Sequence, residues 1–331
     1  RITELLGDGI GPELREATHT VAAALPLDLS FEPVDLSLEN RRARGRELYD
    51  EAVAAMQQTR LAIKYPTVTE TESPNAVLRR QLGFDLIWRP VFTIPGVTSH
   101  YKERIDLHIV RVATGGTYED PGRMIGEHAA VSLRIVEREP VLHAARFAFR
   151  LAKRLGLQVT STSKHTIQRI TDGFFESVTK EVAKEFAGVK HKVELFDALL
   201  ARLILHPGDF QVVVCLNEYG DFLSDMACGL VGSLGVGASA SFGFDDAGEP
   251  NVAMFDPAGG TAPDIAGKNK ANPSASLLAL AMLLHHVGRP ELGDRLKAAV
   301  LDLIGRGECT ADLGGKLSTT DFAASVAKRM A

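Results

Sequence analysis

The sequence predicts an α/β fold with a largely parallel sheet, because stretches typical of strands alternate with stretches typical of helices along its 331 residues. That length is about twice that of a typical domain and favours two domains. The run 210–216, Phe-Gln-Val-Val-Val-Cys-Leu, is apolar except for Gln211 and has three consecutive β-branched valines, as in a strand buried on both faces. No internal repeat or low-complexity stretch interrupts the alternation.

The N-terminal residues predict a strand, a turn and a helix. Residues 1–6 are the strand, and the glycine-rich turn 7–11 leads into a helix with Pro12 in its first turn and Glu13 beside its positive end. The dinucleotide-binding fingerprint requires glycine where this chain has Pro12, so the turn does not match it. Two interpretations stay open, a tight strand-to-helix turn and a loop at the edge of a cofactor site.

Residues 73–82 predict a second helix, with Ser73 as its N-cap and Gly83 as its end. Asn75 and Arg79 are four residues apart and therefore share one face of that helix.

Three further segments have helical periodicity. In 174–186 the apolar residues recur at helical spacing, which predicts that Glu176 and Lys180 pair on the outer face. Residues 296–304 form an amphipathic pattern. The basic segment 142–155 is interpreted as a solvated face and not as a nucleic-acid surface, because the net charge of the chain is −5.

Three arginines stand at predicted ends of helices and strands. Arg79 belongs to the helix described above, Arg89 precedes Pro90, and Arg111 follows the predicted strand 106–110. Guanidinium groups bind carboxylates through paired hydrogen bonds, so the three together suit a substrate with several carboxylates. Each of them alone is more typical of a surface ion pair.

The segment 217–225, Asn-Glu-Tyr-Gly-Asp-Phe-Leu-Ser-Asp, follows the buried strand. It therefore lies at the edge of the sheet where open α/β proteins bind ligands. Asp221 and Asp225 are four residues apart and face the same way on a helix. Their carboxylates suit Mg²⁺ or Mn²⁺, with water and substrate completing the coordination. The alternative is a pair of acids that stabilises the positive end of the helix.

Residues 255–273 form a long loop rich in glycine, proline and alanine. Loops of this length are usually functional, and small side chains let a flat ligand approach the backbone. Asp264 could accept hydrogen bonds from a ribose diol.

Composition excludes several classes of protein. The net charge of −5 argues against a broad nucleic-acid surface, and the longest apolar stretch, 277–284, is too short to cross a membrane. The three cysteines are irregularly spaced, which predicts neither a disulfide framework nor a zinc site. A cytoplasmic enzyme with reduced thiols is the expectation.

Together these segments resemble the β-decarboxylating dehydrogenases, the family of isocitrate, homoisocitrate, isopropylmalate and tartrate dehydrogenases. The resemblance runs from the turn at 7–13 to the Asp-Leu-Gly-Gly sequence at 312–315. It implies a two-domain α/β sandwich that is not a Rossmann fold. Residues 1–90 and 235–331 would form the large domain with the cofactor loop, and 91–234 the small domain with the metal site and the dimer interface. It also implies a homodimer with shared active sites.

The resemblance assigns a role to each candidate residue. Tyr118 and Lys164 match the catalytic groups. The substrate-binding positions are Ser73, Asn75, Arg79, Arg89 and Arg111. NAD is expected against Glu72, Gly260, Thr261, Ala262, Asp264, Ile265 and Asn272. Mg²⁺ or Mn²⁺ is expected on Asp221 and Asp225, with Asp197 supplied by the other subunit.

The implied reaction is NAD-linked oxidation of a 3-substituted malate followed by loss of its β-carboxylate. Ser73 and Asn75 are polar, which favours an isocitrate-like or homoisocitrate-like substrate. Gly115 and Gly116 are closer to isopropylmalate enzymes, so 3-isopropylmalate stays open, as does tartrate or another polar malate analogue. Some relatives are non-catalytic regulatory subunits, an alternative against which the retained site residues argue.

Overall fold

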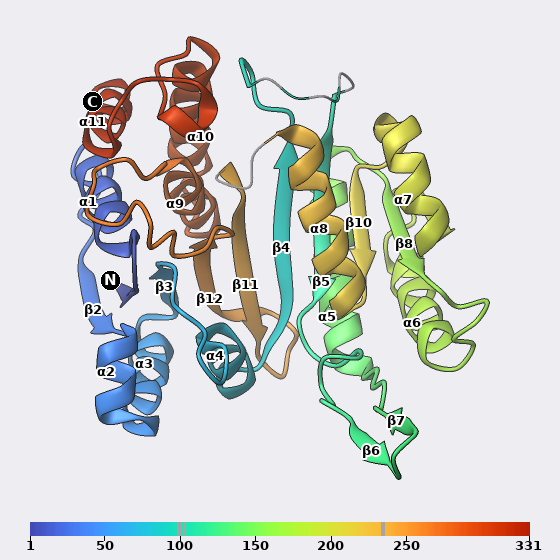
Figure 1. Cartoon of the computed structure of the whole chain (residues 1–331). Coiled ribbons are helices and arrows are strands. Elements are labelled where there is room, and N and C mark those ends of the chain that lie inside the picture. Colours follow the sequence, from blue (N-terminus) through green and yellow to red (C-terminus); the bar gives the residue numbers. More distant parts are fainter. Residues whose placement is uncertain (98, 100, 102–103, 233–235) are drawn as a thin grey trace.

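The computed structural model describes residues 1–97, 99, 101, 104–232 and 236–331. Within these residues a ten-stranded sheet has the order β2-β1-β3-β12-β11-β4-β5-β10-β8-β9, and the β6–β7 hairpin projects away from it (Figure 1). The strands are β1 (Ile2–Leu6), β2 (Phe31–Asp35), β3 (Leu61–Lys64), β4 (Phe84–Phe92), β5 (Asp106–Val112), β6 (Arg123–Ile125), β7 (Ala129–Val131), β8 (Val159–Ser163), β9 (His191–Leu195), β10 (Val212–Cys215), β11 (Ala238–Phe244) and β12 (Pro250–Pro257). The α-helices are α1 (Gly11–Ala22), α2 (Leu38–Arg44), α3 (Arg46–Thr59), α4 (Pro74–Leu82), α5 (Arg138–Leu155), α6 (Thr171–Glu185), α7 (Phe196–Leu205), α8 (Asn217–Val231), α9 (Ser274–His286), α10 (Pro290–Gly305) and α11 (Thr319–Met330).

The sheet is parallel at its two sides and antiparallel in its centre. Strands β2, β1, β3 and β12 run parallel, as do β5, β10, β8 and β9. Strands β12, β11, β4 and β5 are antiparallel to their neighbours in the centre. The predicted largely parallel sheet is therefore confirmed, with an antiparallel centre that the prediction did not specify. The short turn at 245–249 joins β11 to β12, and so short a connection permits only an antiparallel pair.

The predicted domain segments occupy different sides of this sheet. Residues 1–90 and 235–331 supply the strands from β2 to β11, while 91–234 supply those from β5 to β9. Strand β4 crosses the predicted boundary at residue 90. The other boundary, between 234 and 235, lies outside the described residues, and the division into two domains stays a prediction.

Helix α4 begins and ends where the sequence predicts. Pro74 is its first residue, and Gly83 ends it in the left-handed conformation with a φ of 60°. Ser73 occupies the N-cap position, but its side chain makes no capping hydrogen bond, so that part of the prediction is wrong.

Glu176 of α6 does not lie on the outer face as predicted. Its side chain is buried and accepts hydrogen bonds at 2.6 Å from the hydroxyls of Ser161 and Ser163 on β8. Burial raises the pKa of this carboxyl group. The helical period alone could not reveal that β8 places hydroxyls in the core, where they require an acceptor.

Successive residues of the two central strands β4 and β5 face opposite sides of the sheet. Arg89 and Arg111 contact α8 on one face. Trp88 contacts Phe147 of α5 and the His108 ring on the other face. None of the described helices is long and apolar enough to span a membrane.

Candidate active site

A cluster of polar side chains lies where β5 meets the first turn of α8. The Arg111 Nε donates a hydrogen bond to Asn217 Oδ1 at 2.9 Å, and its Nη1 donates to the Asp221 carboxylate. A Cβ on Gly220 would lie 2.6 Å from the Arg111 side chain, so glycine is what lets the helix approach the arginine this closely. Burial lowers the pKa of Arg111, and the Asp221 carboxylate opposes that shift.

Asp221 is the point at which the predicted catalytic and substrate-binding groups meet. Tyr118 donates from its hydroxyl to Asp221 Oδ2 at 3.1 Å. The Arg89 Nη1 lies 3.7 Å from Asp221 and 3.9 Å from Asp225, and it donates to Ser224 Oγ at 2.7 Å. Partial burial and the Asp221 carboxylate raise the pKa of Tyr118, which keeps the phenol protonated as a proton donor requires.

Helix α4 brings Arg79 and Asn75 to the same region. Burial lowers the pKa of Arg79 to about 10, with Asp256 opposing the shift. Arg79 Nε, Arg89 Nε and Asn75 Oδ1 are buried without a hydrogen-bond partner in the part of the chain that the structure describes. Buried polar atoms normally have partners, so two guanidinium donors left without one fit an anionic ligand.

Ser73, Asn75 and Arg89 line a pocket of about 120 Å³ together with Gly260 of the predicted cofactor loop. The pocket therefore joins predicted substrate-binding residues to a predicted cofactor-binding residue.

Two buried charged residues of this pocket were missed by the sequence analysis. Lys64, at the end of β3, donates to the Tyr65 carbonyl at 2.9 Å and to Thr67 Oγ1 at 3.0 Å. Burial lowers the pKa of Lys64 to about 8. Asp256, near the end of β12, accepts a hydrogen bond from Ser239. A charged residue at the carboxyl end of an apolar run was the signal that could have found both.

Lys164 and Asp197 form a second group, away from Asp221. Lys164 Nζ lies 2.6 Å from Asp197 Oδ1, and 32% and 65% of the two side chains are exposed. The hydrogen bond from Lys164 lowers the pKa of Asp197. Among the described contacts, neither side chain touches Tyr118, Asp221 or Asp225.

The carboxylates of α8 can supply part of a cation site. Asp221 and Asp225 are one turn apart, with 36% and 75% of their side chains exposed. Their oxygen donors suit a hard divalent cation. Over the residues described, no three acidic, histidine or cysteine side chains of one chain come together as a metal site. One chain thus offers two ligands, and substrate, water or a carboxylate from elsewhere must complete the shell.

The glycine turn at the N-terminus contacts the predicted cofactor loop directly. Gly9 has a φ of +59°, and a Cβ there would lie 2.0 Å from the Thr261 carbonyl oxygen. The Ile10 N–H donates to that same carbonyl at 2.9 Å. The turn is therefore a tight strand-to-helix turn that packs against the predicted cofactor loop, and its place at the edge of a cofactor site stays a prediction.

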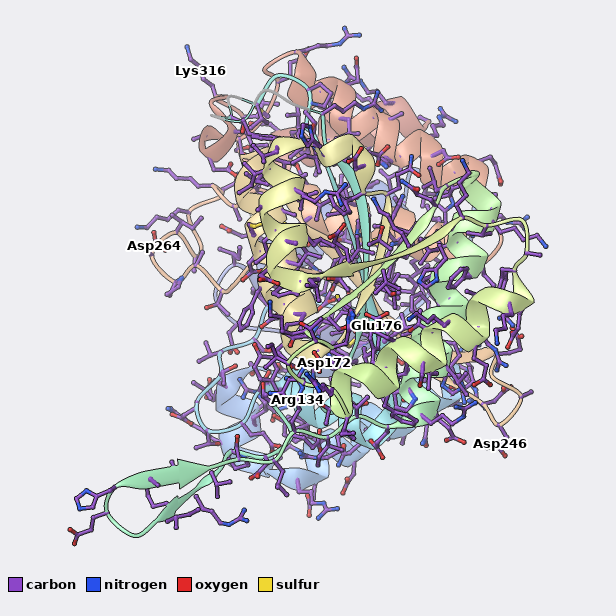
Figure 2. The ribbon with its side chains drawn as sticks, turned by 90° about the vertical axis from the view of Figure 1, so that its right-hand side faces the viewer. Arg134, Asp172, Glu176, Asp246, Asp264 and Lys316 are labelled. Atoms are coloured by element: carbon purple, nitrogen blue, oxygen red, sulfur yellow. The ribbon has the colours of Figure 1, made fainter. Side chains whose placement is uncertain are left out.

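The loop exposes Asp264, whereas the neighbouring Ile265 is partly buried. Figure 2 shows Asp264 on a projecting part of the loop, where Lys268 Nζ binds its backbone carbonyl at 2.8 Å. The Asp264 carboxylate has no ion-pair partner among the described residues. Ile265 packs against a small cluster that contains Ile10 and Tyr65.

Three other predicted cofactor-binding residues have defined positions. Ala262 adopts a φ of +37°, a strained conformation for a residue with a side chain. Asn272 Nδ2 donates to Asp312 Oδ2 at 2.8 Å. Glu72 forms a surface ion pair with Arg80 at 2.6 Å.

Residues 1–326 match the family described as isocitrate/isopropylmalate dehydrogenase. The chain belongs to this family. Subunit 2 of the mitochondrial NAD isocitrate dehydrogenase of Kluyveromyces lactis is 34% identical over 334 residues, which cover 98% of this chain and 89% of the relative. The 3-isopropylmalate dehydrogenase of Methanothermobacter thermautotrophicus is 35% identical over 333 residues, covering 100% and 98%. The crystal structure of isocitrate dehydrogenase from Methylococcus capsulatus matches with a TM-score of 0.90 and 31% identity, covering 99% and 98% of the two chains.

The predicted family and fold are thereby confirmed, and the chain is an NAD-dependent β-decarboxylating dehydrogenase. The two curated relatives act on different substrates, as their names state, at nearly equal identity. Overall similarity therefore does not choose between those substrates.

In this dehydrogenase a buried ionic bridge links the two groups of predicted catalytic residues. Arg134 donates from Nε to Asp172 at 3.1 Å and from Nη1 to Glu218. Asp172 also accepts the backbone N–H of Lys164 at 2.7 Å and the Tyr219 hydroxyl at 3.0 Å. Figure 2 shows Arg134 and Asp172 beside each other.

The bridge also reaches the loop that carries Tyr118. A Cβ on Gly116 would lie 2.0 Å from Glu218 Oε2, so the loop packs directly on that carboxylate. Burial alone would lower the pKa of Arg134. The carboxylates of Glu218 and Asp172 raise it by more, so the pKa of Arg134 is above the ordinary value of arginine. The bridge thus joins α8, the Tyr118 loop and the segment after Lys164.

Proposed function

We propose that the chain catalyses the NAD-dependent and Mg²⁺- or Mn²⁺-dependent oxidative decarboxylation of a 3-substituted malate, with an isocitrate-like or homoisocitrate-like substrate preferred. One observation carries the proposal: Tyr118, Arg89 and Arg111 converge on Asp221, beside guanidinium nitrogens that lack partners. A regulatory subunit without catalysis has no need of this convergence.

Each predicted site residue would have a defined role in the reaction. Arg79, Arg89 and Arg111 hold the substrate carboxylates and orient the 2-hydroxyl. Lys164 accepts the hydroxyl proton, and Tyr118 returns a proton to the carbon that loses the carboxylate. When bound, NAD accepts the hydride, and a cation on Asp221 and Asp225 polarises the hydroxyl and stabilises the developing negative charge.

A homodimer with shared sites is part of the proposal. Lys164 and Asp197 are partly exposed and do not reach Asp221 within their own chain. Nearby apolar side chains are also exposed, including Ile167 at 70% and Ile170 at 84%, as are Met124 and Ile125 of the projecting hairpin. Exposed apolar groups of this kind are typical of an interface. The two-domain division proposed from the sequence would then place the site between domains as well.

The test of the proposed activity is NADH production with Mn²⁺ and a panel of 3-substituted malates, including isocitrate, homoisocitrate, 3-isopropylmalate and tartrate. We expect turnover of at least one of them and its loss on chelation with EDTA, because the hydroxyl then lacks its Lewis acid. Restoration by added Mn²⁺ is the control. Turnover that persists in EDTA would contradict the metal-dependent reaction, and no turnover on the panel would favour the regulatory subunit.

Asn75→Leu is expected to shift preference toward 3-isopropylmalate. The change replaces a hydrogen-bonding side chain on the pocket wall with an apolar one, which is worth about 1–3 kcal/mol between competing substrates. The measurement is the ratio of kcat/KM for isocitrate to that for 3-isopropylmalate. Gln57→Leu, on the exposed side of α3, is the matched control. An unchanged ratio in Asn75→Leu would mean that Asn75 does not contact the substituent.

Preference for NAD over NADP is expected to be at least ~100-fold, because Asp264 would repel a 2′-phosphate that carries nearly two negative charges. The Asp264 carboxylate is exposed and lacks an ion-pair partner among the described residues, so its charge is not neutralised locally. The measurement is the ratio of kcat/KM for the two cofactors. Asp264→Asn should lower the ratio of kcat/KM for NAD to kcat/KM for NADP. Asp246→Asn, in another exposed loop (Figure 2), should leave that ratio unchanged. Comparable efficiency with the two cofactors in the wild type would overturn the assignment.

A further inference from the structure

A second cavity lies on the face of the sheet opposite the active site. It has a volume of about 350 Å³ and is bounded by β4, β5, α5, α9 and α10. Trp88 lines it, and the adjacent residue Arg89 points to the active-site face. Its walls are largely apolar, with Leu151, Leu278 and Met282 contributed by the helices. A cavity of this size and character is typical of small-molecule sites.

The floor of the cavity presents a hydrogen-bond donor. Trp88 Nε1 lies 3.3 Å from His108 Nδ1, and because the indole N–H can only donate, Nδ1 must accept. Burial lowers the pKa of His108 to about 4, so the ring is neutral at pH 7 and its proton is on Nε2. That Nε2–H has no hydrogen-bond partner among the described residues and is available to a ligand.

The rim of the cavity carries two cations without counter-ions. Lys297 Nζ lies 4.1 Å from the centre of the Phe92 ring. Across the described residues, no carboxylate lies within 4.0 Å of Lys297 or Arg154. Burial lowers the pKa of Lys297, while the Asp106 and Asp294 carboxylates oppose that shift from beyond ion-pair distance, so the ammonium group has lost hydration and makes no close ion pair among the described residues. An anion would restore that interaction.

The carboxylates on the same rim are already engaged. Asp106 pairs with Arg104 at 4.0 Å, and Asp294 pairs with the His285 ring at 2.9 Å. Among the described residues, Lys297 and Arg154 are therefore the charged groups of this cavity that make neither an ion pair nor a hydrogen bond, whereas Asp106 has an ion pair and Asp294 a hydrogen bond.

We propose that this cavity binds a small amphipathic carboxylate, with its apolar body against Trp88 and its carboxylate on Lys297. The apolar walls exclude a highly charged ligand such as a tricarboxylate or a nucleotide, and the unpaired cations favour a carboxylate over a neutral molecule. This site does not depend on the proposed function, because it shares no residue with the active site.

Trp88 makes the proposal directly testable, because it is the only tryptophan of the sequence. The full-length protein is titrated with 3-phenylpropionate and, in parallel, with the neutral analogue 3-phenylpropan-1-ol, and tryptophan emission is recorded. We expect a saturable change with 3-phenylpropionate and binding of the alcohol that is at least ~10-fold weaker, the usual contribution of a charge-assisted hydrogen bond.

Two variants locate the binding. Lys297→Met should weaken binding of the carboxylate about tenfold and leave the alcohol unchanged, since it removes the charge and keeps the chain length. Ala281→Leu should block both ligands by filling the cavity, of which Ala281 forms part of the wall. Lys316→Met, on the exposed lysine labelled in Figure 2, is the matched control and should bind like the wild type.

Each contrary outcome would overturn the proposal. No saturable change in Trp88 emission would mean that the cavity does not take this class of ligand. Equal affinity for the acid and the alcohol, or unchanged affinity in Lys297→Met, would mean that the cations do not recognise a carboxylate. Unchanged binding in Ala281→Leu would place the ligand elsewhere. All of these readouts are independent of enzymatic activity.

Discussion

Arg134→Leu is expected to lower the free energy of unfolding by about 3–5 kcal/mol, because it leaves two buried carboxylates without their counter-ion. The Asp172 side chain is fully buried and that of Glu218 is 5% exposed, so water cannot replace the guanidinium. The measurement is urea-induced unfolding of the wild type and the variant, followed by circular dichroism.

A neighbouring ion pair provides the matched control. Arg138 pairs with Glu181 at the start of α5, and 47% and 52% of their side chains are exposed. Arg138→Leu should therefore cost less than about 1 kcal/mol. Adding Glu218→Gln to Arg134→Leu should recover part of the lost stability, because it removes one of the uncompensated charges. Equal effects of Arg134→Leu and Arg138→Leu would show that the bridge does not stabilise the fold.

The parts of the site that could be predicted from sequence are those in which neighbours in the chain are neighbours in space. Asp221 and Asp225 follow a buried strand directly, so the position of the strand in the sheet also places the carboxylates. Asn75 and Arg79 share a helix whose boundaries the sequence marks with proline and glycine. In both cases the spacing of residues along one strand or helix is enough to predict which side chains lie together.

Arg134 could not be predicted in this way. Its partners Asp172 and Glu218 are 38 and 84 residues distant in the sequence, so no spacing marks the bridge. The prediction that Glu176 lies on the outer face of its helix was wrong for a related reason. Its hydroxyl partners are on a strand and not on its own helix. Contacts between distant elements decide where such charged groups lie, and these contacts leave no local pattern.

The antiparallel centre of the sheet also depends on contacts between segments that are distant in the sequence. β4 pairs with β5 and with β11, and β11 follows β5 in the chain by more than a hundred residues. Alternation of strands and helices correctly predicts parallel pairs with local crossovers, such as β1–β2 and β8–β9, whereas β3–β12 and β5–β10 pair across about a hundred residues or more. It contains no information about which strands meet in the middle.

Lys164 and Asp197 pose the remaining question, because they pair with each other and do not approach Asp221 in their own chain. If the sites are shared, two inactive variants should restore activity when they are combined. Lys164→Met and Asp225→Asn are unfolded together and refolded, and random reassortment makes half of the dimers mixed. In each mixed dimer one site combines both lesions, while the other pairs an intact Asp225 with an intact Lys164. Recovered activity should therefore approach about a quarter of that of refolded wild type.

The alternative makes the opposite prediction. If Lys164 and Asp225 serve one site within the same chain, every chain in the mixture carries one lesion in its own site, and no reassortment repairs it. Each variant refolded alone gives the baseline, and subunits with tags of different charge show by native electrophoresis that mixed dimers form. Activity at the baseline in the presence of mixed dimers would place each active site within one subunit. Recovery near a quarter would instead make the dimer the smallest active unit, with Lys164 of each chain acting beside Tyr118 of the other.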